Sequence, residues 1–128
     1  MSKKPRILII EDDPDQVLMY KVQFEGDGFE VFSEMTGEGG LKQAHTIAPD
    51  AILLDIHMED KSGLDVLREL KHSDETKNIP VIVFTNFSKQ HFQEAAQGLG
   101  ADKFIVKTDR LPREIVKDVK GLLGRKSD

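Results

Sequence analysis

The sequence predicts an α/β protein with a doubly wound, five-stranded parallel sheet. Short apolar runs alternate with amphipathic stretches, and this alternation repeats five times along the 128 residues. Near-continuous runs of β-branched residues are typical of parallel strands that are buried on both faces. Strands joined in this way have right-handed crossovers, and helices cover both faces of the sheet. We therefore expect a single domain over residues 1–128, with a core from about residue 5 to about residue 124.

Five segments have the composition of strands. The runs 7–10, 51–54 and 81–84 are almost wholly apolar and predict central strands. The segment 103–106 is more mixed. Residues 29–32 alternate between apolar and polar side chains, as an edge strand does.

Each of five expected helices has its own sequence signals. Asp13 is a good N-cap and Pro14 suits the first helical position, so a helix is expected from there to about Gly26. The other helices are expected to run from Thr36 to about Ile47, from Ser62-Gly63 over Leu64, Leu67 and Leu70, from Ser88 to about Gln97, and from Pro112 over Ile115 and Val119.

Composition excludes several classes of function. The formal net charge is -5, with 18 basic and 23 acidic residues, and no basic face is evident, so direct nucleic-acid binding is not expected. The chain has no cysteine, which excludes disulfides, thiolate zinc sites and a cysteine nucleophile. No apolar run is long enough to span a membrane, and the N-terminus lacks the apolar core of a secretory signal. These features predict a cytoplasmic protein without membrane association.

Polar side chains follow four of the expected strands. They are Glu11, Asp12 and Asp13 after the first strand, Asp55 after the third, Thr85 after the fourth and Lys107 after the fifth. The carboxyl ends of parallel strands lie along one rim of the sheet, where such proteins bind their ligands. We therefore expect carboxylates, a hydroxyl and an ammonium group to converge there.

Taken singly, these residues have ordinary explanations. Asp13 is best explained as a helix cap. Asp55 could cap the turn that follows it, and Lys107 could be a surface lysine. Glu11 and Asp12 could belong to a solvated loop, and a lone Thr at a strand end is uninformative.

Taken together, the same residues favour phosphoryl chemistry on a metal. Oxygen ligands from two or three acids suit Mg²⁺, which uses one or two carboxylates and keeps several waters. Lys107 and Thr85 are donors that a phosphoryl group would need. A carboxylate that attacks phosphorus forms an acyl phosphate.

Four motifs resemble the receiver domain of two-component response regulators. They are ILIIEDDP, PDAILLDIHM, IPVIVFTNFS and ADKFIVK, and they span nearly the whole chain. The resemblance implies a flavodoxin-like receiver fold. A length of 128 residues without a recognisable effector module resembles the stand-alone, chemotaxis-type members.

The resemblance also implies a role for each site residue. Asp55 matches the phosphoacceptor. Asp12 matches the acid that binds Mg²⁺ directly, Glu11 the acid that acts through a water, and the backbone carbonyl of His57 the third protein ligand. Lys107 matches the lysine that pairs with the phosphoryl group.

Four residues are implied in switching and in phosphate lifetime. Thr85 matches the hydroxyl that moves toward the phosphoryl group, and Phe104 the aromatic residue that turns inward behind it. Phe87 and His57 stand where side chains influence the access of water. Our hypothesis is that Phe87 shields the phosphoryl group, whereas His57 also suits an exposed loop residue.

Partners and output follow from the resemblance as expectations. The phosphodonor would be a phosphohistidine on a sensor histidine kinase or a histidine phosphotransfer protein, or a small acyl phosphate. The output would be an unknown downstream protein that binds the face formed by the fourth helix, fifth strand and fifth helix. The domain would be a monomer or a weak, phosphorylation-dependent dimer, and would catalyse only its own phosphorylation and dephosphorylation. It could also be a phosphorelay intermediate or a receiver excised from a larger regulator.

The sequence departs from the family pattern at three positions. Glu59 stands where Pro is typical, and Ser62 where Asp usually precedes Gly63. Thr108 replaces the commonest Pro, so no cis peptide is expected after Lys107.

Three other classes fit less well. A haloacid-dehalogenase-like phosphatase needs a second acid two residues after the nucleophile, where this chain has His57. A flavodoxin-like nucleotide site needs a Gly/Ser/Thr-rich loop in place of Glu11, Asp12 and Asp13. A degenerate receiver that serves only for docking is disfavoured by the complete set of site residues.

Overall fold

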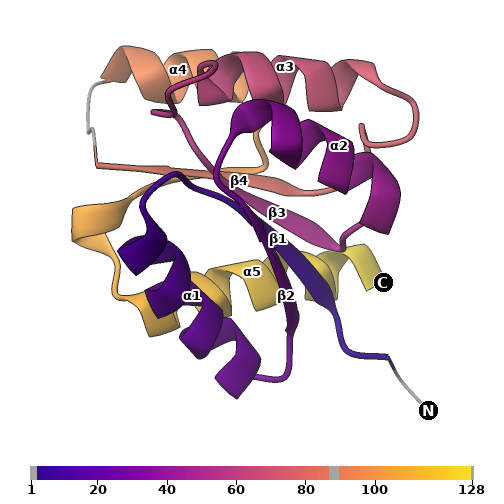
Figure 1. The fold of residues 1–128 in the computed structure, drawn as a ribbon, viewed down its shortest axis with the longest axis vertical. Helices are drawn as coiled ribbons and strands as arrows, with labels where there is room; N and C mark the ends of the chain where they lie inside the picture. The colour runs from indigo at the N-terminus through magenta and orange to yellow at the C-terminus, as the bar shows by residue number, and fades with distance from the viewer. Residues whose placement is uncertain (1–2, 87–89, 128) are drawn as a thin grey trace.

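A computed structural model describes residues 3–86 and 90–127, in which strands and helices alternate along the chain (Figure 1). The strands are β1 (Arg6–Ile10), β2 (Glu30–Glu34), β3 (Ala51–Asp55), β4 (Val81–Thr85) and β5 (Lys103–Val106). The helices are α1 (Pro14–Gly26), α2 (Gly37–Ile47), α3 (Gly63–His72), α4 (Gln90–Gly98) and α5 (Pro112–Ser127), with a short 3₁₀ helix, η1 (Lys107–Asp109), after β5.

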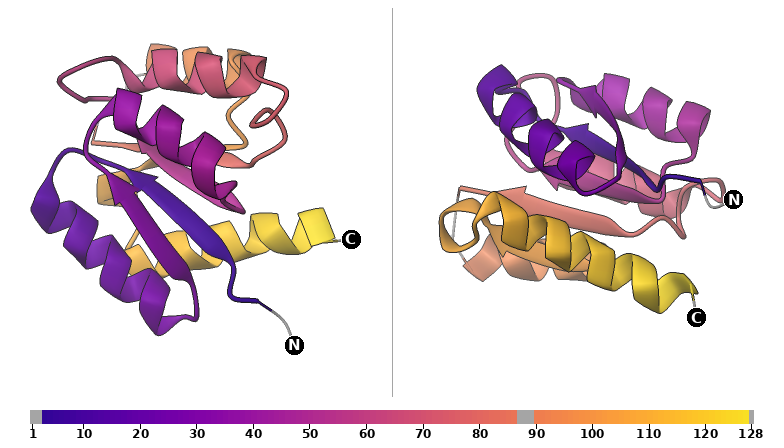
Figure 2. Two further views of the ribbon diagram at one scale, coloured as in Figure 1. Left: turned by 45° about the vertical axis from the view of Figure 1, so that its right-hand side comes forward. Right: turned by 90° about the horizontal axis from the view of Figure 1, so that it is seen from below.

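The five strands form one parallel sheet in the order β2-β1-β3-β4-β5. Helices α1 and α5 cover one face, and α2, α3 and α4 cover the other (Figure 2). This confirms the doubly wound (βα)5 fold that the sequence predicts. Strand β2 lies at an edge, as its alternating pattern predicts, and β5 lies at the other edge, which explains its mixed composition.

Apolar side chains from the sheet build a core on each face. The three central strands β1, β3 and β4 carry fully buried runs because helices cover them on both sides. The core beneath α1 and α5 includes Tyr20 and Phe24 of α1 and Ile115 and Val119 of α5, as the helical spacing predicts. The described part of the chain contains no helix that is long and apolar enough to cross a membrane.

Several predicted boundaries differ from the structure by one or two residues. Phe29 lies in the turn before β2, because its N–H donates to the carbonyl of Phe24 and its ring packs edge-on against the Phe24 ring at 5.0 Å. Strand β2 therefore begins at Glu30 and extends to Glu34. Gly98 is the last residue of α4.

The predicted cap at Asp13 is confirmed, and so are the predicted helix starts at Thr36 and Ser62. The Asp13 carboxylate accepts the N–H of Asp15 at 2.9 Å at the start of α1, and the hydroxyls of Thr36 and Ser62 cap α2 and α3. The predicted cap at Ser88 lies outside the described residues. None of the described peptide bonds is cis, in agreement with the expectation for the bond after Lys107.

Gly63 allows the chain to pass close to the end of β3. Its N–H donates to the carbonyl of Ile56 at 2.7 Å. A Cβ at this position would lie 2.1 Å from the carbonyl oxygen of Asp55 and 2.6 Å from the Cα of Ile56. Both atoms belong to the backbone, so a side chain at residue 63 would displace the segment that follows Asp55.

We expect Gly63→Ala to lower the free energy of unfolding by about 1–3 kcal/mol, the range for forced overpacking. Urea unfolding measures this change. Gly121→Ala in α5 is the matched control, because no atom lies within 4 Å of its added Cβ. The control should gain up to about 1 kcal/mol from helix propensity. Equal effects at the two positions would contradict the close approach at Gly63.

Candidate functional site at the rim of the sheet

The register of the sheet places Glu11 beside Asp55. Ile10 pairs with Leu54 across the parallel strands β1 and β3, so the next residue on each strand lies at the same level. Successive side chains alternate between the faces of a sheet. Glu11 and Asp55 therefore both project toward the side of α1 and α5, opposite to Ile10 and Leu54.

Three carboxylates converge at this rim, as the sequence predicts. One carboxylate oxygen from each of Glu11, Asp12 and Asp55 lies within 4.8 Å of the other two. Glu11 and Asp55 are buried, with 1% and 6% of their surface exposed, whereas Asp12 is partly exposed. Asp12 also lines an open hollow of about 540 Å³ together with His57 and Phe92. The oxygen donors and the open approach suit a hard cation such as Mg²⁺.

Lys107 is buried among these acids. Its ammonium group donates to the Glu11 carboxylate and, at 2.6 Å, to Oε1 of Gln16, and it lies 3.7 Å from Oδ2 of Asp55. It also lies 4.4 Å from the centre of the Phe84 ring, a cation–π contact. Only 7% of the Lys107 side chain is exposed. The alternative interpretation as a surface lysine is therefore wrong.

Gln16 is a site residue that the sequence analysis missed. It occupies the third position of α1, and its amide nitrogen lies 3.5 Å from Oδ2 of the capping Asp13. Its amide oxygen accepts from Lys107. The pattern Asp-x-x-Gln is a recognised signature of a helix start, and it could have drawn attention to a polar side chain beside the rim.

Burial raises the pKa values of Glu11 and Asp55. The pKa of Glu11 rises from 4.5 to about 7, first because of burial and further because of the nearby charge of Asp55, while the hydrogen bond from Lys107 opposes the rise. Burial also raises the pKa of Asp55, and the charge of Lys107 opposes it. The pKa of Tyr20 rises to about 12 through burial and the charges of both acids.

The segment after Asp55 forms part of the mouth of the site. The backbone of His57 forms a hydrogen bond with the Asp55 carboxylate, which stabilises the charged form of that carboxylate. The His57 side chain is exposed, as an ordinary loop residue would be, and its ring meets the Phe92 ring edge-on at 5.7 Å.

The two predicted switch residues lie on the other side of the sheet from Asp55. Thr85 ends β4 and is fully buried. Phe104 on β5 pairs with Val83, two residues before Thr85, so Phe104 and Thr85 project toward the same face. Phe104 is partly buried in the core beneath α3 and α4. Phe87 lies outside the described residues.

Comparison with known proteins agrees with this geometry. The family model of the response regulator receiver domain matches residues 7–120. The polar-differentiation response regulator DivK of Brucella anthropi is 32% identical over 118 residues, which cover 92% of this chain and 95% of that protein.

Solved structures show the same fold. A CheY-like response regulator receiver domain protein from Methanospirillum hungatei has a TM-score of 0.91 and 25% identity, and the match covers 98% of each chain. The signal receiver domain of a histidine kinase from Syntrophus aciditrophicus has a TM-score of 0.85 and 30% identity over 94% of this chain and 90% of that one.

The fold and the acidic rim define a phosphoacceptor domain of the two-component signalling type. The chain belongs to the response regulator receiver family. Its role is that of this family, which is to receive a phosphoryl group as a signal.

The raised pKa of Glu11 predicts a loss of stability with rising pH. Between pH 4.5 and about 7 the folded protein holds a proton on Glu11 that the unfolded chain releases. Stability therefore falls as the pH rises through this window, by up to about 1.4 kcal/mol per pH unit. Glu11→Gln removes this contribution, because the amide does not ionise.

We expect the stability gained by Glu11→Gln over the wild type to be small near about pH 5 and to grow toward about pH 8. Urea unfolding in the presence of EDTA measures it, and Glu75→Gln at an exposed position is the control. A gain that is the same at both pH values would show that burial of an ionised Glu11 does not destabilise the fold.

Proposed function

We propose that Asp55 is the phosphoacceptor of this receiver and that the transfer depends on Mg²⁺ bound at the rim. The observation that carries the proposal is the meeting of three carboxylates within 4.8 Å beside the buried ammonium group of Lys107. Asp55 suits the role of nucleophile better than Glu11, because Glu11 is almost fully buried and paired with Lys107.

The residues at the rim fit a magnesium site. The carboxylates of Asp12 and Asp55 and the backbone carbonyl of His57 would hold the ion, and Glu11 would act through a bound water. When bound, Mg²⁺ would offset the negative charge of the acids and of the incoming phosphoryl group.

Lys107 would exchange partners during the reaction. Its ammonium group, now bonded to Glu11 and Gln16, lies near enough to Asp55 to reach an oxygen of a phosphoryl group on that residue. An oxygen of Asp55 attacks the phosphorus of a phosphohistidine, the phosphorus–nitrogen bond breaks, and the imidazole nitrogen of the donor keeps the electron pair. Water later hydrolyses the acyl phosphate.

The donor would be a sensor histidine kinase or a histidine phosphotransfer protein, in the cytoplasm. The single domain would act as a response regulator or phosphorelay intermediate, as a monomer or a weak phosphorylation-dependent dimer. Its only catalysis would be its own phosphorylation and dephosphorylation.

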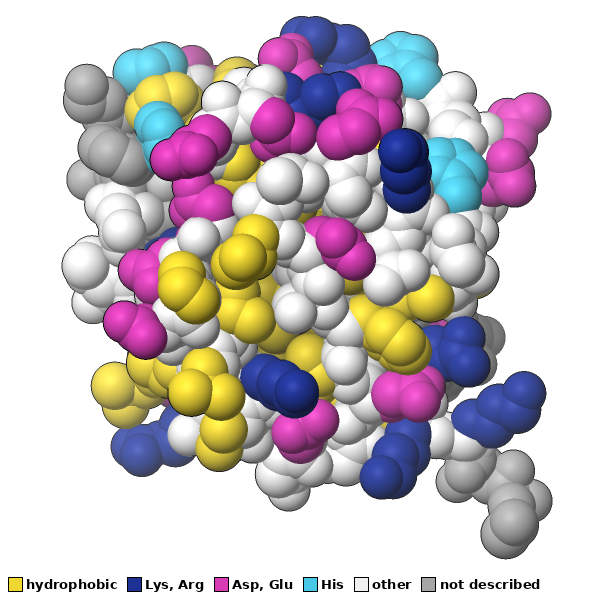
Figure 3. Space-filling model, viewed as in Figure 1, with side chains coloured by type: hydrophobic (Ala, Val, Ile, Leu, Met, Phe, Trp, Pro, Cys, Tyr) yellow, Lys and Arg dark blue, Asp and Glu magenta, His cyan; other side chains and the backbone are white. Residues whose placement is uncertain are grey.

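Output would follow from a population shift of Thr85 and Phe104 that alters the α4–β5–α5 face. Two apolar residues near this face, Phe92 and Leu99, are partly buried and pack against the core. Large apolar side chains are strongly exposed at five of the described residues, which are Leu18, Met19, Val22, Met35 and Leu111. The first three belong to α1, and Figure 3 shows hydrophobic side chains gathered over this side of the molecule. Leu111 directly precedes α5.

Incubation with acetyl phosphate and Mg²⁺ tests the proposal by intact-protein mass. We expect the wild type to gain one phosphoryl group, and EDTA to abolish the gain. Asp55→Asn should gain none, because it lacks the nucleophilic carboxylate. Asp74→Asn is the control, since its carboxylate is exposed and pairs with the nearby Lys77.

Phosphorylation of Asp55→Asn to the wild-type level would refute the assignment of the acceptor. A wild type that gains no phosphoryl group while remaining folded would instead favour the degenerate receiver that serves only for docking.

A further inference from the structure

The loop between β3 and α3, residues 56–62, is hydrogen-bonded to helix α2, which supplies none of the carboxylates of the candidate metal site. We infer that Asp60 is a positioning residue for the metal site: its carboxylate ties this loop to the first turn of α2 and so fixes the segment that carries His57. The inference rests on the proposed magnesium site, in which the His57 carbonyl is a ligand.

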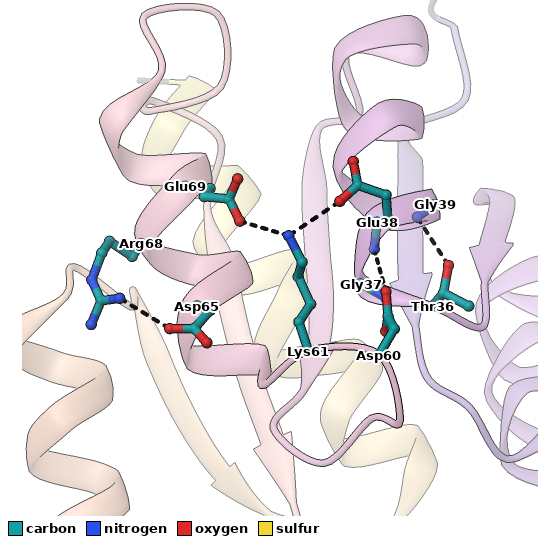
Figure 4. A network of polar contacts seen from close by, with 9 residues as sticks. All are labelled: Thr36, Gly37, Glu38, Gly39, Asp60, Lys61, Asp65, Arg68 and Glu69. Carbon is teal, nitrogen blue, oxygen red and sulfur yellow. Dashed lines mark hydrogen bonds and ion pairs between the residues drawn. The ribbon is translucent and has the colours of Figure 1, made fainter.

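Asp60 binds two backbone amides of α2 at once. Its Oδ1 accepts the N–H of Gly37 at 2.8 Å and its Oδ2 accepts the N–H of Glu38 at 3.0 Å (Figure 4). The hydroxyl of Thr36 accepts the N–H of Gly39 at 2.9 Å. These three amides have no partner within the helix, so two side chains, one of them from a distant loop, complete the N-terminus of α2. The same bonds lower the pKa of Asp60.

Lys61 adds a second link beside Asp60. Its ammonium group lies 3.1 Å from Glu38 of α2 and 3.0 Å from Glu69 of α3, so it bridges the two helices (Figure 4). A Cβ on Gly37 would lie 2.5 Å from Cγ of Lys61, which shows how closely the Lys61 stem approaches α2. Both glutamates are more than half exposed, and such ion pairs contribute little to stability. The hydrogen bonds from the Asp60 carboxylate to the backbone of α2 are therefore the main link between the loop and that helix.

The loop is held at its base and again within its length. At the α3 end, the N–H of Gly63 donates to the carbonyl of Ile56, directly after Asp55. At the α2 side, Asp60 holds the chain three residues after His57. A backbone carbonyl can serve as a metal ligand only where the chain that carries it is fixed, because no side-chain rotation can bring it into place. Residues that orient metal ligands in this way commonly change metal affinity by about 10-fold or more when they are replaced.

Isothermal titration of the unphosphorylated protein with Mg²⁺ tests the inference without any phosphodonor. We expect Asp60→Ala to bind Mg²⁺ about 10-fold more weakly than the wild type. Asp60→Asn should lie between the two, because its amide oxygen keeps one of the two bonds. Lys61→Met keeps the stem but removes the ion pairs, and it should bind nearly as tightly as the wild type. Asp74→Ala controls for the loss of one exposed carboxylate.

Hydrogen exchange gives a second measurement that does not need a variant. Coupling between two sites is reciprocal, so Mg²⁺ should slow the exchange of the Gly37 and Glu38 amides in the wild type. The amides in the last turn of α2, remote from Asp60, serve as the internal reference. Because it uses the wild type, this measurement still tests the positioning role of Asp60 if Asp60→Ala does not fold.

The outcomes separate the inference from the proposed function. If the wild type binds Mg²⁺ and both Asp60 variants bind it equally well, the positioning role is wrong while the proposed function stands. Exchange of the Gly37 and Glu38 amides that is unaffected by Mg²⁺ would also overturn the positioning role. If the wild type binds no Mg²⁺, the proposed site and the positioning role both fall.

Discussion

The crowding of negative charge at the rim of the sheet is the constraint on which the rest of the site depends. Three carboxylates lie within 4.8 Å of one another, and Lys107 supplies the positive charge buried among them. If all four groups were ionised, the cluster would carry two negative charges in a largely buried place. Burial is the main cause of the raised pKa values of Glu11 and Asp55, and the charge of a neighbouring carboxylate adds to the rise of each. A divalent cation would offset this charge. The repulsion between the carboxylates in the metal-free protein therefore favours binding of the ion.

The folded protein remains stable despite this electrostatic repulsion because the centre of the sheet is well buried. The runs that lead into the rim, such as Ile7–Ile10 of β1, are fully buried between two helical layers. Hydrophobic burial of this extent can outweigh a few kcal/mol of unfavourable electrostatics at one edge. The residues at the rim can therefore serve phosphoryl chemistry at some cost in stability, while the buried centre of the sheet stabilises the fold.

Much of this arrangement could be predicted from the sequence. Buried parallel strands have a distinctive composition, and the residue that ends each strand must lie at the rim, which is why Glu11, Asp55 and Lys107 could be predicted to meet. The pairing of Lys107 could not, because a long side chain in a charged pocket has several possible partners. Gln16 and Asp60 were missed for a related reason. Their roles depend on where α1 and the loop after β3 lie relative to other elements. A local pattern such as Asp-x-x-Gln marks the start of a helix but does not encode that placement.

The loop after Asp55 is also where the sequence departs most from the family pattern, with Glu59 and Ser62 in place of the usual residues. Ser62 still caps α3 with its hydroxyl, so the start of that helix is preserved. Glu59 lacks the ring that would restrict the backbone at a Pro, and the unfolded loop has more conformational freedom to lose. The bonds from Asp60 to the N-terminus of α2, one residue later, restrict the loop by a different means. The residues proposed for the chemistry thus match the family motifs, whereas the loop after Asp55 departs from the family pattern and is held to α2 by Asp60.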